Sequence, residues 1–335
     1  MSKTFIPEGY QSYLSLYETQ TAIGLIKRIF EDALSNSLNL KRVSAPLFVD
    51  PKSGLNDDLN GTERAVSFHI AETQSYAQVV HSLAKWKRLA LYKYGFRPGE
   101  GLYTDMNAIR RDEEMTNLHS IYVDQWDWEK VITKELRHEA YLKSTVCLIV
   151  EAICHTLETV KASFPTLPVT LSREVNFITT QELEDLYPNL SPKERENVYV
   201  KEHKTAFIME IGDTLKSGDK HDGRAPDYDD WALNGDIVFW NDVLGAAFEV
   251  SSMGIRVDSL SLDTQLKKAN CDSRRTFPFH QMLLNDELPL TMGGGIGQSR
   301  VCMLLLGKAH IGEVQVSIWD DATLTLCKTH HIELL

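Results

Sequence analysis

Two long stretches of the chain have the spacing of amphipathic helices. Residues 17–38 and residues 136–160 both carry apolar side chains at intervals of three and four. This period matches one helical turn, so each stretch is predicted to be a helix with one buried face. A further helix is predicted over residues 191–204, because Ser191 and Glu194 form a capping-box pattern with a proline between them at the first helical position.

Between these helices, short runs with alternating or continuous apolar character indicate strands. The predicted strands are residues 43–49, 78–80, 101–110, 121–128, 175–179, 205–211, 233–240 and 246–257. Two pairs, 101–110 with 121–128 and 233–240 with 246–257, are close enough in the chain to form antiparallel hairpins. Ser82 is predicted to be the N-cap of a short helix that follows residue 81.

Composition narrows the functional classes. The chain has 335 residues, of which 43% are hydrophobic and 24% charged, which is typical of globular domains. The net charge of −12 argues against a broad nucleic-acid surface. Five cysteines without a closely spaced pair argue against a disulfide framework or a structural zinc site. No apolar run of membrane-spanning length is expected, and we expect a cytoplasmic protein.

The most unusual stretch is the glycine-rich segment 291–300, which precedes an apolar run at 301–306. Four glycines in five residues allow the backbone to lie close to a bulky ligand. Arg300 then opens a predicted helix, where a planar cation beside the helix N-terminus suits a polyphosphate. The spacing matches neither a P-loop nor a dinucleotide fingerprint. A glycine-rich turn with a surface arginine is the alternative.

Several charged residues in loops and strands are candidates for a site. Asp57 lies in the polar loop 53–62, and an acid in such a loop is ordinarily expected to be exposed to solvent. A basic cluster at 85–88, which includes Lys87, is either a solvated face or the partner of a carboxylate. Strand alternation places Gln125 and Asp127 on one face of their strand.

Two acids in the predicted strands 233–240 and 246–257 are candidate metal ligands. A carboxylate in a buried strand is costly unless it is paired or bound to a metal. Asp236 and Glu249 offer the hard oxygen ligands that Mg²⁺ prefers. The alternative is that both acids form ion pairs with Arg256.

Taken in order, these features resemble the three signatures of class II aminoacyl-tRNA synthetases. The first is a long helix followed by the strand that contains Pro46, the second is the hairpin with Arg110 at the end of its first strand, and the third is the glycine segment that ends at Arg300. Longer strings are similar to the ammonia-dependent asparagine synthetase (aspartate–ammonia ligase) family. These strings are residues 81–87, 99–104, 122–128, 224–230, 233–236, 251–256 and 293–300.

This resemblance covers nearly the whole chain and carries several implications. It implies an α+β fold, with an antiparallel sheet flanked by helices, in a single catalytic domain over residues 1–335. It implies a homodimer whose interface includes the first signature. It also implies that ATP and L-aspartate form β-aspartyl-AMP and pyrophosphate, and that ammonia then displaces AMP to give L-asparagine. Neither a nucleic acid nor a membrane is expected as a partner.

The resemblance also implies roles for individual residues. Arg110 would hold the α-phosphate and Arg300 the triphosphate tail, with Lys87 as a third catalytic residue. Asp236 and Glu249 would bind Mg²⁺. The implied aspartate-binding residues are Asp57, Ser82, Lys87, Gln125, Asp127, Asp229, Ser252 and Arg256. The implied nucleotide-binding residues are Arg110, Glu113, Arg224, Tyr228, Gly295, Gly297 and Arg300.

The residue types fit a substrate that carries one ammonium and two carboxylates. An acid, Asp57, Asp127 or Asp229, is expected to hold the ammonium, and Lys87 or Arg256 to hold a carboxylate. The sequence leaves both choices open.

Three other functions are weaker alternatives. A tRNA synthetase would need a tRNA-reading module, for which residues outside 40–305 leave no room. An inactive paralogue would be expected to lose the phosphate arginines or the metal acids, which are present. A glutamine-dependent enzyme would need a cysteine nucleophile in a suitable turn. Free ammonia is therefore the expected nitrogen source.

Overall fold

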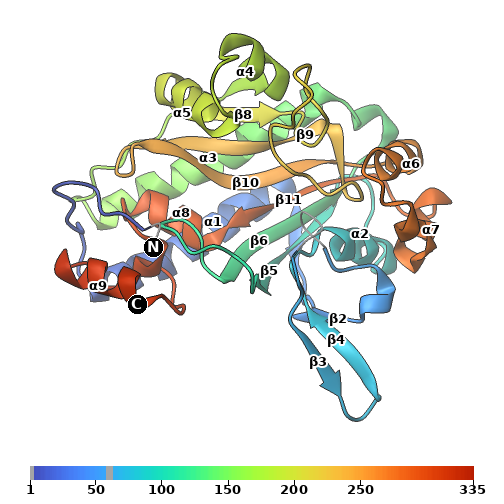
Figure 1. The fold of residues 1–335 in the computed structure, drawn as a ribbon, viewed down its shortest axis with the longest axis horizontal. Coiled ribbons are helices and arrows are strands. Elements are labelled where there is room, and N and C mark those ends of the chain that lie inside the picture. The colour runs from blue at the N-terminus through green and yellow to red at the C-terminus, as the bar shows by residue number, and fades with distance from the viewer. Residues whose placement is uncertain (1–3, 58–62) are drawn as a thin grey trace.

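An eight-stranded mixed sheet forms the centre of the computed structural model, which describes residues 4–57 and 63–335 (Figure 1). Its strands are β1 (Leu40–Arg42), β5 (Gly101–Ile109), β6 (Tyr122–Val131), β11 (Thr291–Gly297), β10 (Ala246–Arg256), β9 (Asp229–Asn241), β8 (Thr205–Met209) and β7 (Asn176–Thr179), in this spatial order. Residues 58–62 of the predicted loop 53–62 lie outside the described residues.

Helices lie around this sheet and at its ends. They are α1 (Leu16–Leu38), α2 (Ala84–Lys93), α3 (Glu139–Ser163), α4 (Thr180–Leu186), α5 (Pro192–His203), α6 (Ser259–Lys268), α7 (Pro278–Leu284), α8 (Gln298–Leu305) and α9 (Asp321–Thr329). The predicted helices at 17–38, 136–160 and 191–204 correspond to α1, α3 and α5. The capping box of α5 is present, with the Ser191 amide donating to Glu194 Oε2 at 2.9 Å.

The strand pairing confirms the predicted hairpins and refines the expected topology. In the spatial order of the sheet, every neighbouring pair from β5 through β6, β11, β10 and β9 to β8 is antiparallel, which includes β5 with β6 and β9 with β10. The two edge pairs, β1 with β5 and β7 with β8, are parallel. Each parallel connection contains a helix or a second sheet, which provides the longer crossover that parallel pairing requires.

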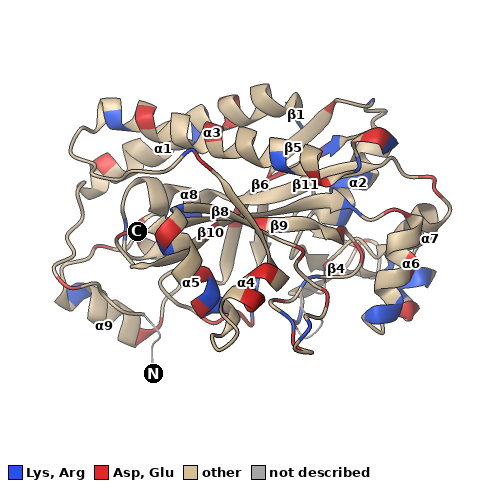
Figure 2. Cartoon of the chain, turned by 90° about the horizontal axis from the view of Figure 1, so that it is seen from above, with Lys and Arg blue, Asp and Glu red and all other residues tan. Residues whose placement is uncertain are grey.

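One face of the sheet carries the main hydrophobic core. Helices α1 and α3 lie side by side on this face (Figure 2). Phe30 of α1 packs on Trp126 of β6 with ring centroids 4.6 Å apart, and the indole N–H donates to Glu31. Because strand side chains alternate, burial of Trp126 and Trp128 on this face leaves Gln125 and Asp127 on the opposite face.

Helix α3 corrects the expectation that no segment is apolar enough to span a membrane. Among the described helices it alone has a sufficient length and hydropathy for a span, but 56% of the qualifying window is buried inside the protein. Its buried side chains, such as Leu142, Val146 and Ile153, belong to the main core. The hydropathy of α3 is therefore explained by its place in the core.

Three local predictions were wrong or incomplete. Only the last two residues of the predicted strand 43–49 form a strand, the short β2 (Phe48–Val49); β1 ends before this range, and Pro46 lies in the irregular segment between them. Helix α2 begins after Leu83, and Ser82 caps no helix, although its hydroxyl accepts a hydrogen bond from the Ala84 amide. Helices α4, α6, α7 and α9 were not predicted; they span only seven to ten residues each, too few to show a clear period.

A small sheet projects from the body of the molecule (Figure 1). It consists of β2, β4 (Ser75–Val79) and β3 (Ser67–Ile70), all antiparallel. Large apolar side chains are exposed on and beside this sheet. They are Leu47, Phe48, Phe68 and Tyr76.

A buried histidine should make the fold sensitive to mild acid. Burial lowers the pKa of His310 from 6.5 to about 4, because its fully buried imidazole accommodates the neutral form. Between these values the unfolded chain binds a proton that the folded chain does not, so this contribution to stability is complete above pH 6.5 and lost toward pH 4. Lowering the pH from 7 to 5 should remove about 2 kcal/mol through this residue.

The replacement His310→Asn tests this expectation, because Asn also provides an acceptor for the Gly312 amide that now donates to His310 Nδ1. Unfolding free energies from denaturant titrations should fall less between pH 7 and pH 5 in the variant than in the parent protein. Equal losses would show that His310 does not carry the effect.

Candidate active site

A cavity of about 420 Å³ opens on the face of the sheet opposite α1 and α3. Strands β6, β10 and β11, helix α2, the β5–β6 loop and the loop before β9 contribute to its walls. Its lining contains the following predicted site residues: Asp57, Ser82, Lys87, Arg110, Glu113, Gln125, Asp127, Arg224, Tyr228, Asp229, Glu249, Ser252, Arg256, Gly295, Gly297 and Arg300. Asp236 does not line the cavity, but it binds Arg224, which does.

Glycines make the floor of this cavity. Gly294, Gly295 and Gly297 of β11 line the cavity, between β6 and β10. A Cβ atom on Gly295 would overlap Gln125 Oε1 and would lie 2.8 Å from Asp127 Oδ1. The glycine segment therefore provides space for side chains of the neighbouring strand as well as for a ligand.

Lys87 and Asp127 form a buried ion pair at one end of the cavity. Lys87 Nζ lies 3.2 Å from Asp127 Oδ1 and donates to the Gly294 carbonyl at 2.8 Å. The exposed fractions are only 1% for Lys87 and 3% for Asp127. Burial lowers the pKa of Lys87, and the Asp127 and Glu129 carboxylates oppose this shift. Asp127 Oδ2 is buried without a hydrogen-bond partner among the described residues.

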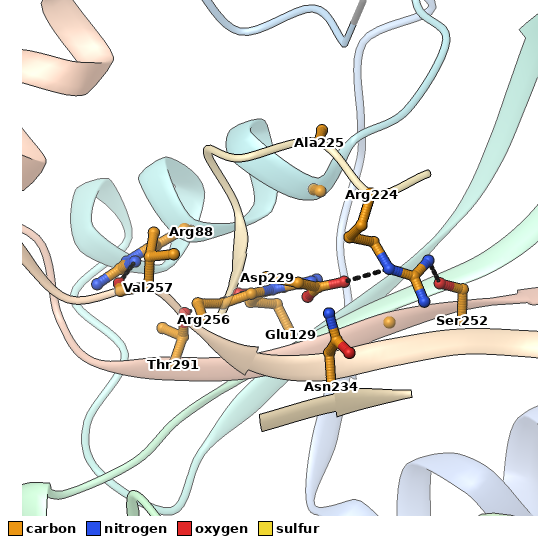
Figure 3. A network of polar contacts seen from close by, with 12 residues as sticks. Arg88, Glu129, Arg224, Ala225, Asp229, Asn234, Ser252, Arg256, Val257 and Thr291 are labelled. Carbon is orange, nitrogen blue, oxygen red and sulfur yellow. Dashed lines mark hydrogen bonds and ion pairs between the residues drawn. The ribbon is translucent and has the colours of Figure 1, made fainter. Parts of the chain in front are cut away.

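Arg256 lies at the centre of a larger network (Figure 3). Its Nε and Nη2 donate to the carboxylate of Glu129 at 2.7–3.1 Å, and its Nη1 binds Asp229. Asp229 also lies near Arg224, whose guanidinium binds Ser252 and, at 2.6 Å, Asp236. These contacts link the three strands β6, β9 and β10 by alternating charges.

Arg300 and Arg110 mark the other end of the cavity. Arg300 lies in the first turn of α8, as predicted, and its Nη1 donates to the Glu249 carbonyl at 3.0 Å. Its Nη2 contacts His119 Nε2 at 2.9 Å. Burial, and then the Arg300 charge, lower the pKa of His119 to about 4, so the imidazole is neutral and accepts this hydrogen bond.

The side chain of Arg110 is less constrained. Its Nη1 lies 3.9 Å from Glu113 Oε2, and its Nε is buried without a hydrogen-bond partner among the described residues. A guanidinium that lines a cavity with an unused donor is suited to an anionic ligand.

The two candidate metal acids lie close enough to affect each other. Burial raises the pKa of Asp236 to about 7; the Arg224 charge opposes this rise and the Glu249 charge adds to it. The alternative in which both acids pair with Arg256 is wrong. Asp236 pairs with Arg224, and Glu249 lies 3.4 Å from Arg300 Nη1.

The basic cluster at 85–88 is not a solvated face. Lys85, Lys87 and Arg88 are all buried. Lys85 Nζ lies 3.2 Å from Asp227, whose carboxylate also contacts Arg274 and His280 at 2.9 Å each. Since Asp227 precedes Tyr228 and Asp229, this second cluster anchors the loop that carries them.

Three important residues escaped sequence reasoning. His119 lies in a charged loop, where no periodicity identifies it. Asp227 was one acid among several in the segment 221–231. Glu129, in contrast, could have been found, because strand alternation places it on the same face as Gln125 and Asp127.

Comparisons with known proteins agree with this geometry. The model of the aspartate-ammonia ligase family matches residues 17–331. The chain belongs to this family. The aspartate–ammonia ligase of Ruminiclostridium cellulolyticum is 60% identical over 336 aligned positions, which cover 100% of both chains. That of Clostridium tetani is 59% identical, with 99% of this chain and 98% of the relative covered.

Solved structures confirm the class II synthetase fold. Asparaginyl-tRNA synthetase of Pyrococcus horikoshii, complexed with asparaginyl-adenylate, superposes with a TM-score of 0.65 at 16% identity and covers 89% of this chain and 68% of its own. The enzyme of Entamoeba histolytica gives the same TM-score at 12% identity, with 90% and 66% covered. At these identities the likeness establishes the fold alone.

Proposed function

We propose that this member of the family is a ligase that makes L-asparagine from L-aspartate and ammonia, with ATP converted to AMP and pyrophosphate. The observation that carries the proposal is one cavity that joins a buried mixed-charge cluster, at Lys87, Asp127 and Arg256, to the arginines at 110 and 300. The mixed cluster suits an amino acid with two carboxylates. The arginines suit a nucleotide triphosphate.

In the first step, an oxygen of the aspartate β-carboxylate attacks the α-phosphorus of ATP, and pyrophosphate leaves. Arg110 holds the α-phosphate and Arg300 the departing tail, so that positive charge is in place where negative charge develops. The carboxylate is a poor acyl donor until its oxygen is bonded to phosphorus. In the second step, ammonia attacks the activated acyl carbon, and AMP leaves with that oxygen.

Aspartate binds beside Lys87, Arg256 and Asp127 in this proposal. We assign the substrate ammonium to Asp127, because its Oδ2 is buried and unused. Asp229 is a poorer choice, since Arg256 and Arg224 already surround its carboxylate. Ser82, Gln125, Ser252 and Asp57 complete the aspartate end. Glu113, Arg224, Tyr228, Gly295 and Gly297 face the nucleotide.

Asp236 and Glu249 would hold Mg²⁺ in this proposal. Two mutually repelling carboxylates with hard oxygen donors fit such an ion, and Mg²⁺ commonly takes only one or two carboxylates, with phosphate and water as its other ligands. No cluster of three or more His, Cys, Asp or Glu side chains suited to a metal occurs in residues 4–57 and 63–335. When bound, Mg²⁺ neutralises phosphate charge.

The variant Glu249→Gln tests this assignment. Loss of one of two carboxylates should raise the Mg²⁺ concentration for half-maximal activity by about tenfold or more, at fixed ATP. The exposed Glu202 on α5 provides a control, and Glu202→Gln should leave the Mg²⁺ titration unchanged. An unchanged Mg²⁺ titration in Glu249→Gln would show that Glu249 pairs with Arg300 and does not bind Mg²⁺.

We further propose that residues 1–335 act as a single catalytic domain in a cytoplasmic homodimer. Support for the dimer comes from the exposed side chains of Leu47 and Phe48 beside Pro46, and of Phe68 and Tyr76 on the projecting sheet. Light scattering of the purified protein decides this point, since a monomer at all concentrations contradicts it.

Product analysis tests the function. The protein is incubated with ATP, Mg²⁺, aspartate and ammonium, and the products are separated by chromatography. The proposal predicts asparagine, AMP and pyrophosphate in equal amounts. Replacement of ammonium by glutamine should abolish asparagine formation. ADP with phosphate would instead indicate an acyl-phosphate ligase.

A further inference from the structure

Glu129 is a fully buried acid beneath the proposed aspartate end of the cavity. Its exposed fraction is 0%, and both carboxylate oxygens are engaged. Oε1 accepts from the Thr291 hydroxyl at 2.7 Å and from Arg256 Nε at 3.0 Å, while Oε2 accepts from Arg256 Nη2 at 2.7 Å. Lys87 Nζ lies 4.0 Å away. Glu129 thus contacts both cations that can hold a substrate carboxylate.

These contacts fix the plane of the Arg256 guanidinium. Glu129 occupies one edge of the donor fork, and Asp229 binds Nη1 (Figure 3). The Tyr228 ring lies over the guanidinium, with its centroid 5.7 Å from Cζ. A guanidinium has five N–H groups, so donors remain free on a side chain that lines the cavity. The orientation of these donors is therefore set before any ligand binds.

A glycine of β11 leaves room for the Glu129 carboxylate of this pair. Glu129 of β6 lies opposite Gly293 of β11, and Gly293 lies opposite Gly254 of β10. Arg256 lies two residues beyond Gly254 on β10, and its side chain crosses β11 to reach Glu129. A Cβ atom on Gly293 would overlap Glu129 Oε2. The glycine segment therefore makes room for Glu129 as well as for the proposed nucleotide.

We propose that Glu129 is a positioning residue for substrate recognition: it orients Arg256, and through proximity Lys87, so that their free N–H groups meet a carboxylate of aspartate. This inference rests on the proposed function. Glu129 itself touches no substrate. Because both of its oxygens are used by the protein, it adds negative charge that balances the cations without competing for the substrate ammonium.

A purely structural role would have different consequences. A buried ion pair broken on one side destabilises a protein wherever it lies. Positioning of Arg256 adds a specific effect, in which aspartate binding weakens more than ATP binding. A rise in the aspartate KM without a similar rise in the ATP KM therefore distinguishes a positioning role from a purely structural one.

The experiment measures aspartate and ATP KM values by aspartate-dependent ATP–pyrophosphate exchange in three variants, with unfolding curves for each. Glu129→Gln keeps the shape of the side chain and removes its charge. It should raise the aspartate KM by about tenfold or more and change the ATP KM by less than about twofold. Thr291→Val and Gly293→Ala should shift the aspartate KM in the same direction, the latter by displacing Glu129.

Glu184→Gln is the matched control. Glu184 is a second buried acid paired with an arginine, Arg195 at 3.5 Å, and it lies outside the cavity. This variant should lose stability but retain the parent KM for aspartate. The inference is overturned if the aspartate KM of Glu129→Gln equals that of the parent protein. If Glu129→Gln does not fold, the same result in both Thr291→Val and Gly293→Ala overturns it. Absence of exchange in the parent protein would instead overturn the proposed function.

Discussion

Replacement of Arg300 by alanine should lower kcat/KM for ATP by about a hundredfold or more, the magnitude typical for loss of one charged group at a developing phosphate charge. Arg300 is held in place before ATP binds, by the Glu249 carbonyl on one side and His119 on the other. Its removal takes away both charge and orientation at the proposed pyrophosphate end.

Steady-state kinetics with ATP as the varied substrate measure this effect. Arg300→Lys should recover only part of the loss, because an ammonium keeps the charge but lacks the planar fork. Arg173 serves as a control outside the cavity, since it is paired with Glu158 on the surface. Arg173→Ala should behave like the parent protein. If Arg300→Ala also keeps the parent kcat/KM, the triphosphate lies elsewhere.

Replacement of Lys87 by methionine should raise the aspartate KM by about a hundredfold, with a smaller effect on the ATP KM. The substitution keeps most of the side-chain volume and removes the ammonium that lies 3.2 Å from Asp127 Oδ1. The variant lacks the ammonium that would bind a substrate carboxylate, and it leaves Asp127 buried without this cationic partner, which destabilises the fold.

Lys85 provides an unusually close control. It lies on the same helix, is also buried, and also pairs with an aspartate at 3.2 Å, but it does not line the cavity. Lys85→Met should therefore lose comparable stability with a much smaller change in aspartate KM. Equal KM changes in both variants would show that the effect does not come from contact of Lys87 with aspartate.

The sequence predicted much of the fold because its signals are local. The amphipathic periods of α1 and α3, the capping box of α5 and the two hairpins all depend on residues close together in the chain. The parallel edges of the sheet could not be predicted in the same way. The pairing of β7 with β8, for instance, depends on how α4 and α5 pack, which no local period encodes.

The residues of the candidate site were also only partly predictable from the sequence. Arg300 and Asp127 were identified from their motifs, and the structure brings both into one cavity. The partners of Asp236 and Glu249 could not be deduced, because Arg224 reaches Asp236 from a loop and Arg300 reaches Glu249 from helix α8. Burial of Lys85 was also hidden, since its partner Asp227 is far away in sequence.

The adenylate is the central feature of the proposed mechanism, and an oxygen label tests it most directly. Aspartate carrying ¹⁸O in its β-carboxylate is supplied with ATP, Mg²⁺ and ammonium, and the products are analysed by mass spectrometry. The mechanism predicts one labelled oxygen in each AMP, with the other retained in the asparagine amide. Label in inorganic phosphate, or AMP without label, would contradict attack of the carboxylate on the α-phosphorus.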